Sequence, residues 1–174
     1  MYLLKVEHKR FPVIENFSHS KLNSATRQIL NIVLAEDDAD DAFVFNLALN
    51  ELNIAFELKH VDNGENLLAL LKELLPDIIF LDINMPCKDG LSCLVEIRRN
   101  STFDNVPVVL ISGHTYSRYI SDGFSNGANY YIIKANNLAQ LVNYLKAIFF
   151  IDWKNFMYYP PKSQFIIGNI EGAA

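Results

Sequence analysis

The fold of this chain is decided by the stretch Ile78-Ile79-Phe80-Leu81-Asp82, which leads into Ile83-Asn84-Met85-Pro86-Cys87-Lys88-Asp89-Gly90. Four consecutive apolar residues predict a short strand that is apolar on both faces, as strands buried inside a parallel sheet are. The run stops abruptly at an acid, Asp82. The stretch therefore predicts a buried strand whose only polar side chain lies at its carboxyl end.

The same pattern recurs on both sides of this stretch. Ile32-Val33-Leu34-Ala35 is another apolar run that stops at acids, and segments with apolar residues at helical spacing alternate with such runs. Five strands alternating with five helices predict an α/β fold, a doubly wound parallel sheet with helices on both faces. The predicted strands are 32–35, 56–61, 78–81, 106–111 and 130–133, and the predicted helices are one capped by Asp38 or Asp40 and then 67–75, 91–99, 117–126 and 138–149.

Length and composition limit the classes of function. The 174 residues fit one domain, which we place at residues 30–150, between an N-terminal extension (1–29) and a C-terminal extension (151–174) without a separate output domain. The net charge of −5, with scattered Lys and Arg, provides no basic face for nucleic acid. No apolar run approaches the roughly 18 residues of a membrane span. Because Cys87 and Cys93 match no zinc or disulfide pattern, we expect reduced thiols and a cytoplasmic protein without nucleic-acid or membrane partners.

The residues that end the predicted strands are Glu36-Asp37, Asp82, Ser112 and Lys134. In an open α/β sheet these strand ends meet at one edge, where ligands bind. Three carboxylates close together repel one another, and a cation must offset the charge that Lys134 leaves. An all-oxygen site suits Mg²⁺ or Mn²⁺. Together with the hydroxyl and the ammonium, such a site can neutralise a phosphoryl group while a carboxylate, for which Asp82 is the candidate, acts as nucleophile.

The segment from Asp82 to Gly90 resembles the phosphoacceptor loop of bacterial response-regulator receiver domains, whose pattern is D-x-x-M-P-x-x-x-G. Residues 32–38 resemble the metal-binding start of that family, and Ser112 and Lys134 follow Asp82 at closely similar offsets, 30 and 52 residues. The resemblance covers about residues 31–149. It implies a flavodoxin-like sheet with strand order 2-1-3-4-5, and a stand-alone response regulator of two-component signalling.

The resemblance also implies the roles of the acids. Asp82 would accept a phosphoryl group from a sensor histidine kinase, a phosphotransfer protein or a small phosphodonor. Mg²⁺ or Mn²⁺ would be bound by Asp82, by Asp37 directly, by Glu36 through water, and by the backbone carbonyl of Asn84.

The remaining implied roles concern switching. Ser112 would hydrogen-bond the phosphoryl group, Lys134 would pair with another of its oxygens, and Tyr131 matches an aromatic residue that swings inward. Asn84 and His114 occupy positions that tune the lifetime of the phosphate. The added charge would bias a two-state surface that binds a downstream protein. The sequence names neither the kinase nor that target, and it leaves a homodimer open.

One departure from the family and two alternative functions are weighed against this reading. The family places proline after its lysine, often in a cis peptide, whereas Ala135 follows Lys134. We expect a trans bond, because a non-proline cis form costs about 2.5–4 kcal/mol. The missing proline is the only support for a phosphate-independent interaction module. An aspartate-nucleophile phosphatase would need a second aspartate where this chain has Asn84, so we expect no enzyme activity beyond self-phosphorylation and autodephosphorylation.

The large apolar side chains between positions 153 and 159 are too many to leave exposed. They are those of Trp153, Phe156, Met157, Tyr158 and Tyr159. Packing against the chain's own core and a partner or dimer surface are both open, and residues 164–167 could add a short strand.

Overall fold

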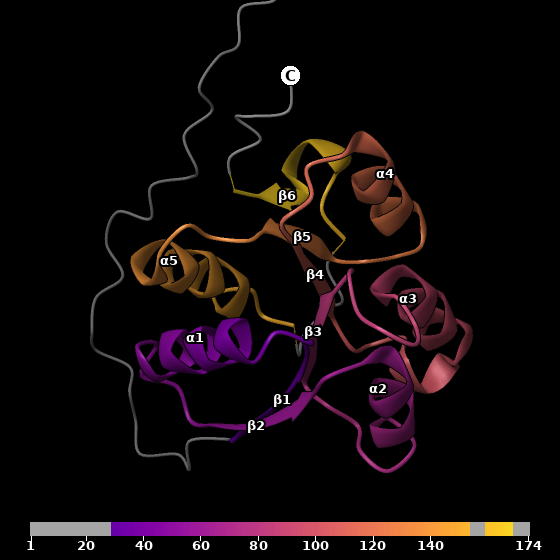
Figure 1. Ribbon diagram of the computed structural model, residues 1–174, viewed down its shortest axis with the longest axis horizontal. Helices are drawn as coiled ribbons and strands as arrows, with labels where there is room; N and C mark the ends of the chain where they lie inside the picture. The colour runs from indigo at the N-terminus through magenta and orange to yellow at the C-terminus, as the bar shows by residue number, and fades with distance from the viewer. Residues whose placement is uncertain (1–28, 154–158, 169–174) are drawn as a thin grey trace, which may run out of the picture.

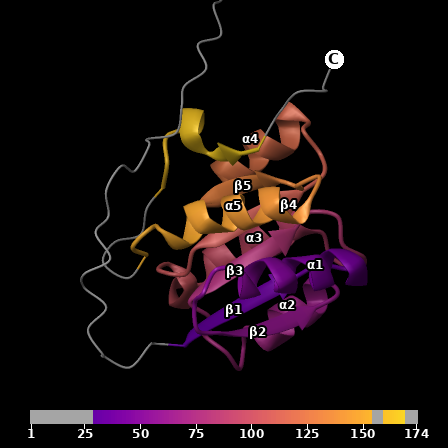
Figure 2. The ribbon, with the colours of Figure 1, turned by 90° about the vertical axis from the view of Figure 1, so that its left-hand side faces the viewer.

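A single parallel sheet runs through the centre of the molecule, with α1 and α5 on one face and α2, α3 and α4 on the other (Figure 1; Figure 2 shows the same layers from the side). The computed structural model describes residues 29–153 and 159–168. Most of the predicted N-terminal extension (1–28) and the tail residues Phe156, Met157 and Tyr158 lie outside the described residues. Within the described ranges, no helix is both long enough and apolar enough to cross a bilayer.

Helices and strands alternate along the chain, as the apolar pattern predicts. Most observed bounds lie within two residues of the predicted ones, but α2 ends at Leu70, five residues before the predicted end. The elements are β1 (Leu30–Ala35), α1 (Ala39–Asn50), β2 (Phe56–Val61), α2 (Gly64–Leu70), β3 (Ile78–Asp82), α3 (Gly90–Arg99), η1 (Ser101–Phe103), β4 (Val108–Ser112), α4 (Ser117–Ser125), β5 (Tyr130–Ile133), α5 (Leu138–Phe149), η2 (Lys162–Gln164) and β6 (Ile166–Ile167).

The strand order is β2-β1-β3-β4-β5-β6, and every neighbouring pair is parallel. The predicted order of the first five strands is therefore confirmed. The order reverses between β1 and β3, because β2 pairs with one edge of β1 and β3 pairs with the other. Ala35 lies in register with Leu81, so the residues that follow β1 lie beside the residue that ends β3. This point of reversal is where open α/β sheets bind ligands.

The side chains of the sheet divide between two hydrophobic clusters, one on each face. In β3, Ile79 and Leu81 belong to the cluster under α2, α3 and α4, and Ile78 and Phe80 belong to the cluster under α1 and α5. All five residues of β3 are buried. Burial on both faces explains why the strand sequence is continuously apolar rather than alternating.

A sixth strand comes from the C-terminal segment, which the sequence left either as a strand or as a packed tail. Ile166–Ile167 pairs with β5, whose edge would otherwise expose unpaired backbone groups. Phe165 is fully buried, with its ring centroid 5.2 Å from that of Phe124 and 6.3 Å from that of Tyr131. The Trp153 indole N–H donates to the Ile148 carbonyl at 3.0 Å. Trp153 and Phe165 therefore pack on the chain's own core, whereas Tyr159 is 50% exposed and leaves a partner or dimer surface open.

Candidate functional site

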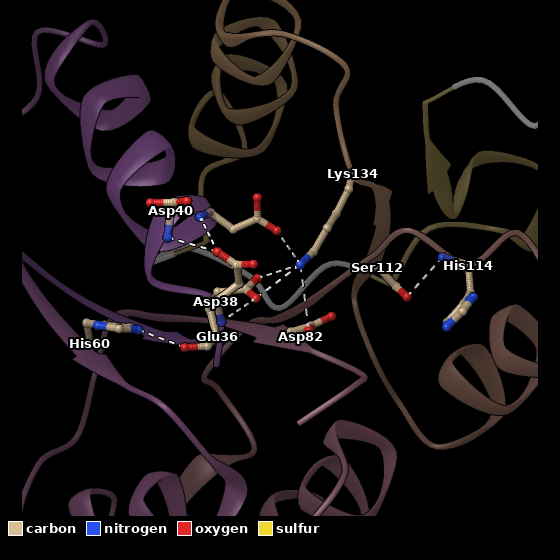
Figure 3. Close-up of polar contacts among 9 residues, drawn as sticks. Glu36, Asp38, Asp40, His60, Asp82, Ser112, His114 and Lys134 are labelled. Atoms are coloured by element: carbon tan, nitrogen blue, oxygen red, sulfur yellow. Dashed lines mark hydrogen bonds and ion pairs between the residues drawn. The ribbon is translucent and has the colours of Figure 1, made fainter. Parts of the chain in front are cut away.

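Three carboxylates meet where β1 and β3 end; Figure 3 shows two of them, Glu36 and Asp82, on either side of the Lys134 ammonium contacts. Glu36 and Asp37 follow β1, and Asp82 ends β3. One oxygen atom from each lies within 4.8 Å of the others. Glu36 and Asp82 are each only 3% exposed, whereas Asp37 is exposed. The acids that the sequence placed at one edge of the sheet are therefore brought together, with one of the three facing solvent.

The loop after β3 is packed against the backbone of Asp82. The Gly90 N–H donates to the Ile83 carbonyl at 2.9 Å. A Cβ atom on Gly90 would come within 2.1 Å of the Asp82 carbonyl oxygen, closer than any side chain permits. Glycine is therefore required at the end of this loop, because only an unsubstituted Cα lets the start of α3 approach the acid-bearing strand end.

Burial leaves this cluster with uncompensated negative charge. Burial is the largest influence on Glu36 and raises its pKa, and the neighbouring charge of Asp82 raises it further, while a hydrogen bond from Lys134 lowers it. Burial also raises the pKa of Asp82, against the opposing charge of Lys134. Backbone N–H groups of Asn84 and Ile83 lower the pKa of Asp82 without restoring its ordinary value. The native fold thus holds two carboxyl groups in surroundings that disfavour their ionised forms.

Lys134 reaches the cluster from the end of β5. Its backbone N–H donates to the Ser112 carbonyl at 2.9 Å, which fixes the start of the side chain. Its ammonium Nζ lies 2.9 Å from Glu36 Oε2 and 3.7 Å from Asp82 Oδ2. Burial by itself would lower the pKa of Lys134, but hydrogen bonds to Asp41 and Glu36 raise it above its ordinary value. The protonated Lys134 therefore forms ion pairs with carboxylates that would otherwise repel one another.

Asp41 is the residue of this network that sequence reasoning missed. Its place in the sequence indicates only an acid near the start of a helix, where the helix dipole favours negative charge, and it does lie in the first turn of α1. Its Oδ2 also lies 2.6 Å from Lys134 Nζ, the shortest of the three ion pairs of that lysine. No local pattern reveals this contact, because the two residues are 93 positions apart.

Ser112, Tyr131 and His114 form a second polar group beside the acids. Ser112 is fully buried, and its Oγ accepts a hydrogen bond from the His114 N–H at 3.2 Å, so its hydroxyl faces His114 rather than Asp82 (Figure 3). The Tyr131 ring is also fully buried, and its hydroxyl donates to the His114 carbonyl at 2.7 Å. Burial raises the pKa of Tyr131, against a hydrogen bond to Ser112. The predicted hydroxyl and aromatic residues therefore lie in one connected group.

Two further expectations concern the backbone. The described residues contain no cis peptide bond, so the Lys134–Ala135 bond is trans, as predicted. The lysine reaches the acids without the family's proline, although its ammonium lies nearer to Glu36 and Asp41 than to Asp82. Asn84 is exposed in the loop two residues after Asp82.

The donor set fits a divalent cation. Among the described residues, Asp82 Oδ1 is a buried side-chain oxygen without a hydrogen-bond partner. A buried acceptor left unpaired is costly and calls for a ligand. Neighbouring carboxylates supply further oxygens, which Mg²⁺ and Mn²⁺ prefer. The site thus combines an unpaired anionic oxygen with a set of hard ligands.

Comparison with known proteins identifies the family. The model of the response regulator receiver domain matches residues 32–146, which span all five predicted strands. The chain belongs to this family. The receiver domain is 31% identical over 106 residues to the transcriptional regulatory protein CitT of Bacillus subtilis, a match that covers 61% of this chain and 46% of CitT. It is 28% identical over 124 residues to the response regulator Rcp1 of Synechocystis, with 67% of this chain and 84% of Rcp1 covered. The chain thus spans about half the length of CitT.

Solved receiver structures superpose on this receiver domain. The phosphorylated cyanobacterial phytochrome response regulator RcpA has a TM-score of 0.66 at 32% identity, with 70% of this chain and 91% of RcpA covered. The Mn²⁺-bound form of Rcp1 has a TM-score of 0.65 at 27% identity, with 76% and 99% covered. Sequence and structure therefore agree on a receiver domain homologous to response regulators.

Proposed function

We propose that this receiver domain is a phosphorylation-controlled switch whose phosphoacceptor is Asp82. The observation that carries the proposal is Asp82 Oδ1, which is buried and has no hydrogen-bond partner among the residues that the structure describes, in a carboxylate that lies beside two further carboxylates and the Lys134 ammonium. A carboxylate without hydrogen bonds on one oxygen keeps a lone pair available for attack. Its cationic neighbour can compensate the charge that arrives with a phosphoryl group.

The reaction that we propose is transfer from a phosphohistidine, or from a small acyl phosphate, to Asp82. A carboxylate oxygen of Asp82 attacks phosphorus, the bond from phosphorus to the donor's nitrogen or oxygen breaks, and its electron pair stays with the donor. The product is an acyl phosphate on Asp82. Lys134, already 3.7 Å from Asp82 Oδ2, pairs with one phosphoryl oxygen, and Ser112 donates its hydroxyl hydrogen to another after turning from His114.

The residues that we propose for the cation are Asp37, Asp82, Glu36 and the backbone carbonyl of Asn84, with Mg²⁺ or Mn²⁺ as the ion. A divalent cation at this position supplies positive charge that offsets the phosphoryl oxygens. The protein residues hold that charge in place: two of the carboxylates are buried at strand ends, and Asp37 opens the site to solvent. Receiver domains bind divalent metals, and the Mn²⁺-bound Rcp1 structure is one example.

The signal would leave the site through Ser112, Tyr131 and the loop that contains His114. Turning the Ser112 hydroxyl toward a phosphoryl group breaks its present contact with the His114 N–H. The Tyr131 hydroxyl donates a hydrogen bond to the His114 carbonyl, so the loop and the tyrosine ring would move together. We propose that the changed surface around β4, α4 and β5 binds a downstream protein, and that Asn84 and His114 set the lifetime of the phosphate.

The partners follow from the same proposal. Receiver domains interact with histidine kinases and downstream targets; for this chain we propose a sensor histidine kinase or phosphotransfer protein, one protein target, and neither nucleic acid nor membrane. A homodimer is compatible with it. We propose a cytoplasmic location because both cysteines are free thiols. We retain residues 30–150 as the receiver unit, with extensions at 1–29 and 151–174.

Intact-mass measurement after incubation with acetyl phosphate and Mg²⁺ tests the proposal. The native chain should gain one phosphoryl group, and the gain should need the metal. Asp82→Asn should gain none, whereas Asp104→Asn, which removes an exposed acid, should behave like the native chain. Equal labelling of Asp82→Asn would disprove the acceptor assignment. Sustained hydrolysis of a phosphate ester would instead favour a phosphatase; we expect none, because Asn84 offers no acid or base.

A further inference from the structure

Lys134 and the proposed cation need the same carboxylates. The ammonium lies 2.9 Å from Glu36 Oε2 and 3.7 Å from Asp82 Oδ2, and both residues belong to the three-acid cluster. A second cation can enter only if the ammonium gives up part of these contacts, because like charges that share a ligand repel. The lysine therefore needs a partner outside the cluster.

Asp41 is that partner. It does not belong to the three-acid cluster, yet its Oδ2 lies closer to Lys134 Nζ, at 2.6 Å, than either cluster acid does. Its side chain is about half exposed, at 49%, so it can carry its charge without the penalty that burial imposes on Glu36 and Asp82. Moving the ammonium toward Asp41 keeps the lysine neutralised and frees the buried oxygens.

The start of α1 explains why this carboxylate faces the lysine. Asp38 is the N-cap and accepts hydrogen bonds from the N–H groups of Asp40 and Asp41. In a capping box, a Glu or Gln at the third helical position, which Asp41 occupies here, accepts a hydrogen bond from the N–H of the cap residue. Here that N–H donates to Glu36 Oε1 instead, at 3.3 Å. The Asp41 carboxylate is therefore released from the cap and available to Lys134.

We propose that Asp41 is a positioning residue for metal binding: it draws the Lys134 ammonium away from Glu36 and Asp82 so that a divalent cation can bind there. This inference rests on the proposed metal site and adds a residue to it. Removing Asp41 returns the whole lysine charge to the cluster acids, and metal affinity falls. The expected loss is modest, about two- to five-fold, because partly exposed ion pairs contribute little.

The experiment is a double-mutant cycle on Mn²⁺ affinity, measured by the electron paramagnetic resonance signal of free Mn²⁺ at 0.15 M ionic strength. Asp40→Asn is the matched control: it removes the same charge one residue away, and Asp40 points away from Lys134 (Figure 3). Asp41→Asn should weaken binding more than Asp40→Asn does. Lys134→Gln should raise Mn²⁺ affinity, and it should raise it by a larger factor when Asp41 is already replaced by Asn. This difference is the coupling between Asp41 and Lys134, and the same cycle made with Asp40→Asn should show none. Asp41→Glu should restore most of the affinity.

The outcomes separate this inference from the proposed function. If the native chain binds no Mn²⁺, or Asp82→Asn binds it equally well, the metal site and this inference both fail. If the native chain binds through Asp82 but Asp41 and Asp40 show equal coupling to Lys134, only the inference is overturned. Tighter binding by Asp41→Asn would overturn it as well. Unchanged Trp153 fluorescence in each variant verifies that the fold is kept.

Discussion

Replacing the phosphoacceptor should stabilise the protein when no metal is present. Asp82→Asn removes a buried charge whose Oδ1 has no hydrogen-bond partner in the described part of the chain. Because burial raises the pKa of folded Asp82 above its ordinary value of 3.8, the folded state holds its proton to higher pH than the unfolded state does. The contribution of Asp82 to stability therefore falls as pH rises from that value through the raised pKa of the folded state.

The size of the effect follows from the burial of the Asp82 charge and from the ion pairs of Lys134. Burying an unpaired acceptor costs about 1–3 kcal/mol, and more when the acceptor is charged. The Asn amide still places a polar atom at this position but carries no charge, so only the charged part of the cost is removed. The attraction between Asp82 and Lys134 across 3.7 Å is lost, but Lys134 keeps Asp41 at 2.6 Å and Glu36 at 2.9 Å. We expect a net gain of about 1 kcal/mol in the free energy of unfolding at pH 7.

Magnesium should reverse the order of the two proteins. A ligand that binds only the folded state at 100 times its Kd stabilises it by about 2.7 kcal/mol. The native chain should gain this stabilisation, and Asp82→Asn should lose most of it. The native chain is then the more stable protein in Mg²⁺ and the less stable one in a chelator.

Urea unfolding followed by Trp153 fluorescence measures both effects, because this is the sole tryptophan of the chain and its indole is bonded to the end of α5. Urea unfolding curves recorded with a chelator or with Mg²⁺, at pH values from 3 to 8, give the free energies of unfolding. Glu73→Gln is the control, because Glu73 is an exposed acid in the turn before β3. It should change neither the stability in chelator nor the stabilisation by Mg²⁺. The reasoning is refuted if Asp82→Asn is less stable than the native chain in chelator at pH 7, or if Mg²⁺ stabilises both equally.

Three further outcomes are expected. Gly90→Ala should lower both stability and Mn²⁺ affinity, because the new Cβ meets the Asp82 carbonyl oxygen at 2.1 Å; unchanged urea and Mn²⁺ titrations would contradict this. Phe165→Ala should destabilise by up to about 3–5 kcal/mol, limited by the free energy of docking the C-terminal segment, and thermal unfolding measures the loss. An aromatic thiol reagent should modify exposed Cys87 in the native state but Cys93 only in denaturant, since Cys93 is buried and burial raises its pKa to about 11.

The sequence by itself determined the elements and the edge at which the chemistry lies. Apolar runs such as residues 78–81 are local signals, and they fix a buried strand because only a strand covered on both faces needs no polar side chain. Once parallel strands are established, their carboxyl ends must meet at one edge. The meeting of Glu36, Asp37, Asp82 and Lys134 was therefore predictable without coordinates.

The tertiary structure alone decided how these charges are shared. The pairing of Asp41 with Lys134 depends on how α1 packs beside α5, and no periodicity encodes a contact across 93 residues. The same holds for Phe165, which is buried because the C-terminal segment returns to the edge of β5. Raised pKa values at Glu36 and Asp82 come from burial, which is a property of the packed chain. The position of a strand depends on residues that are neighbours in the sequence. Ion pairs and desolvation depend on segments that are far apart in the sequence and come together only when the chain folds.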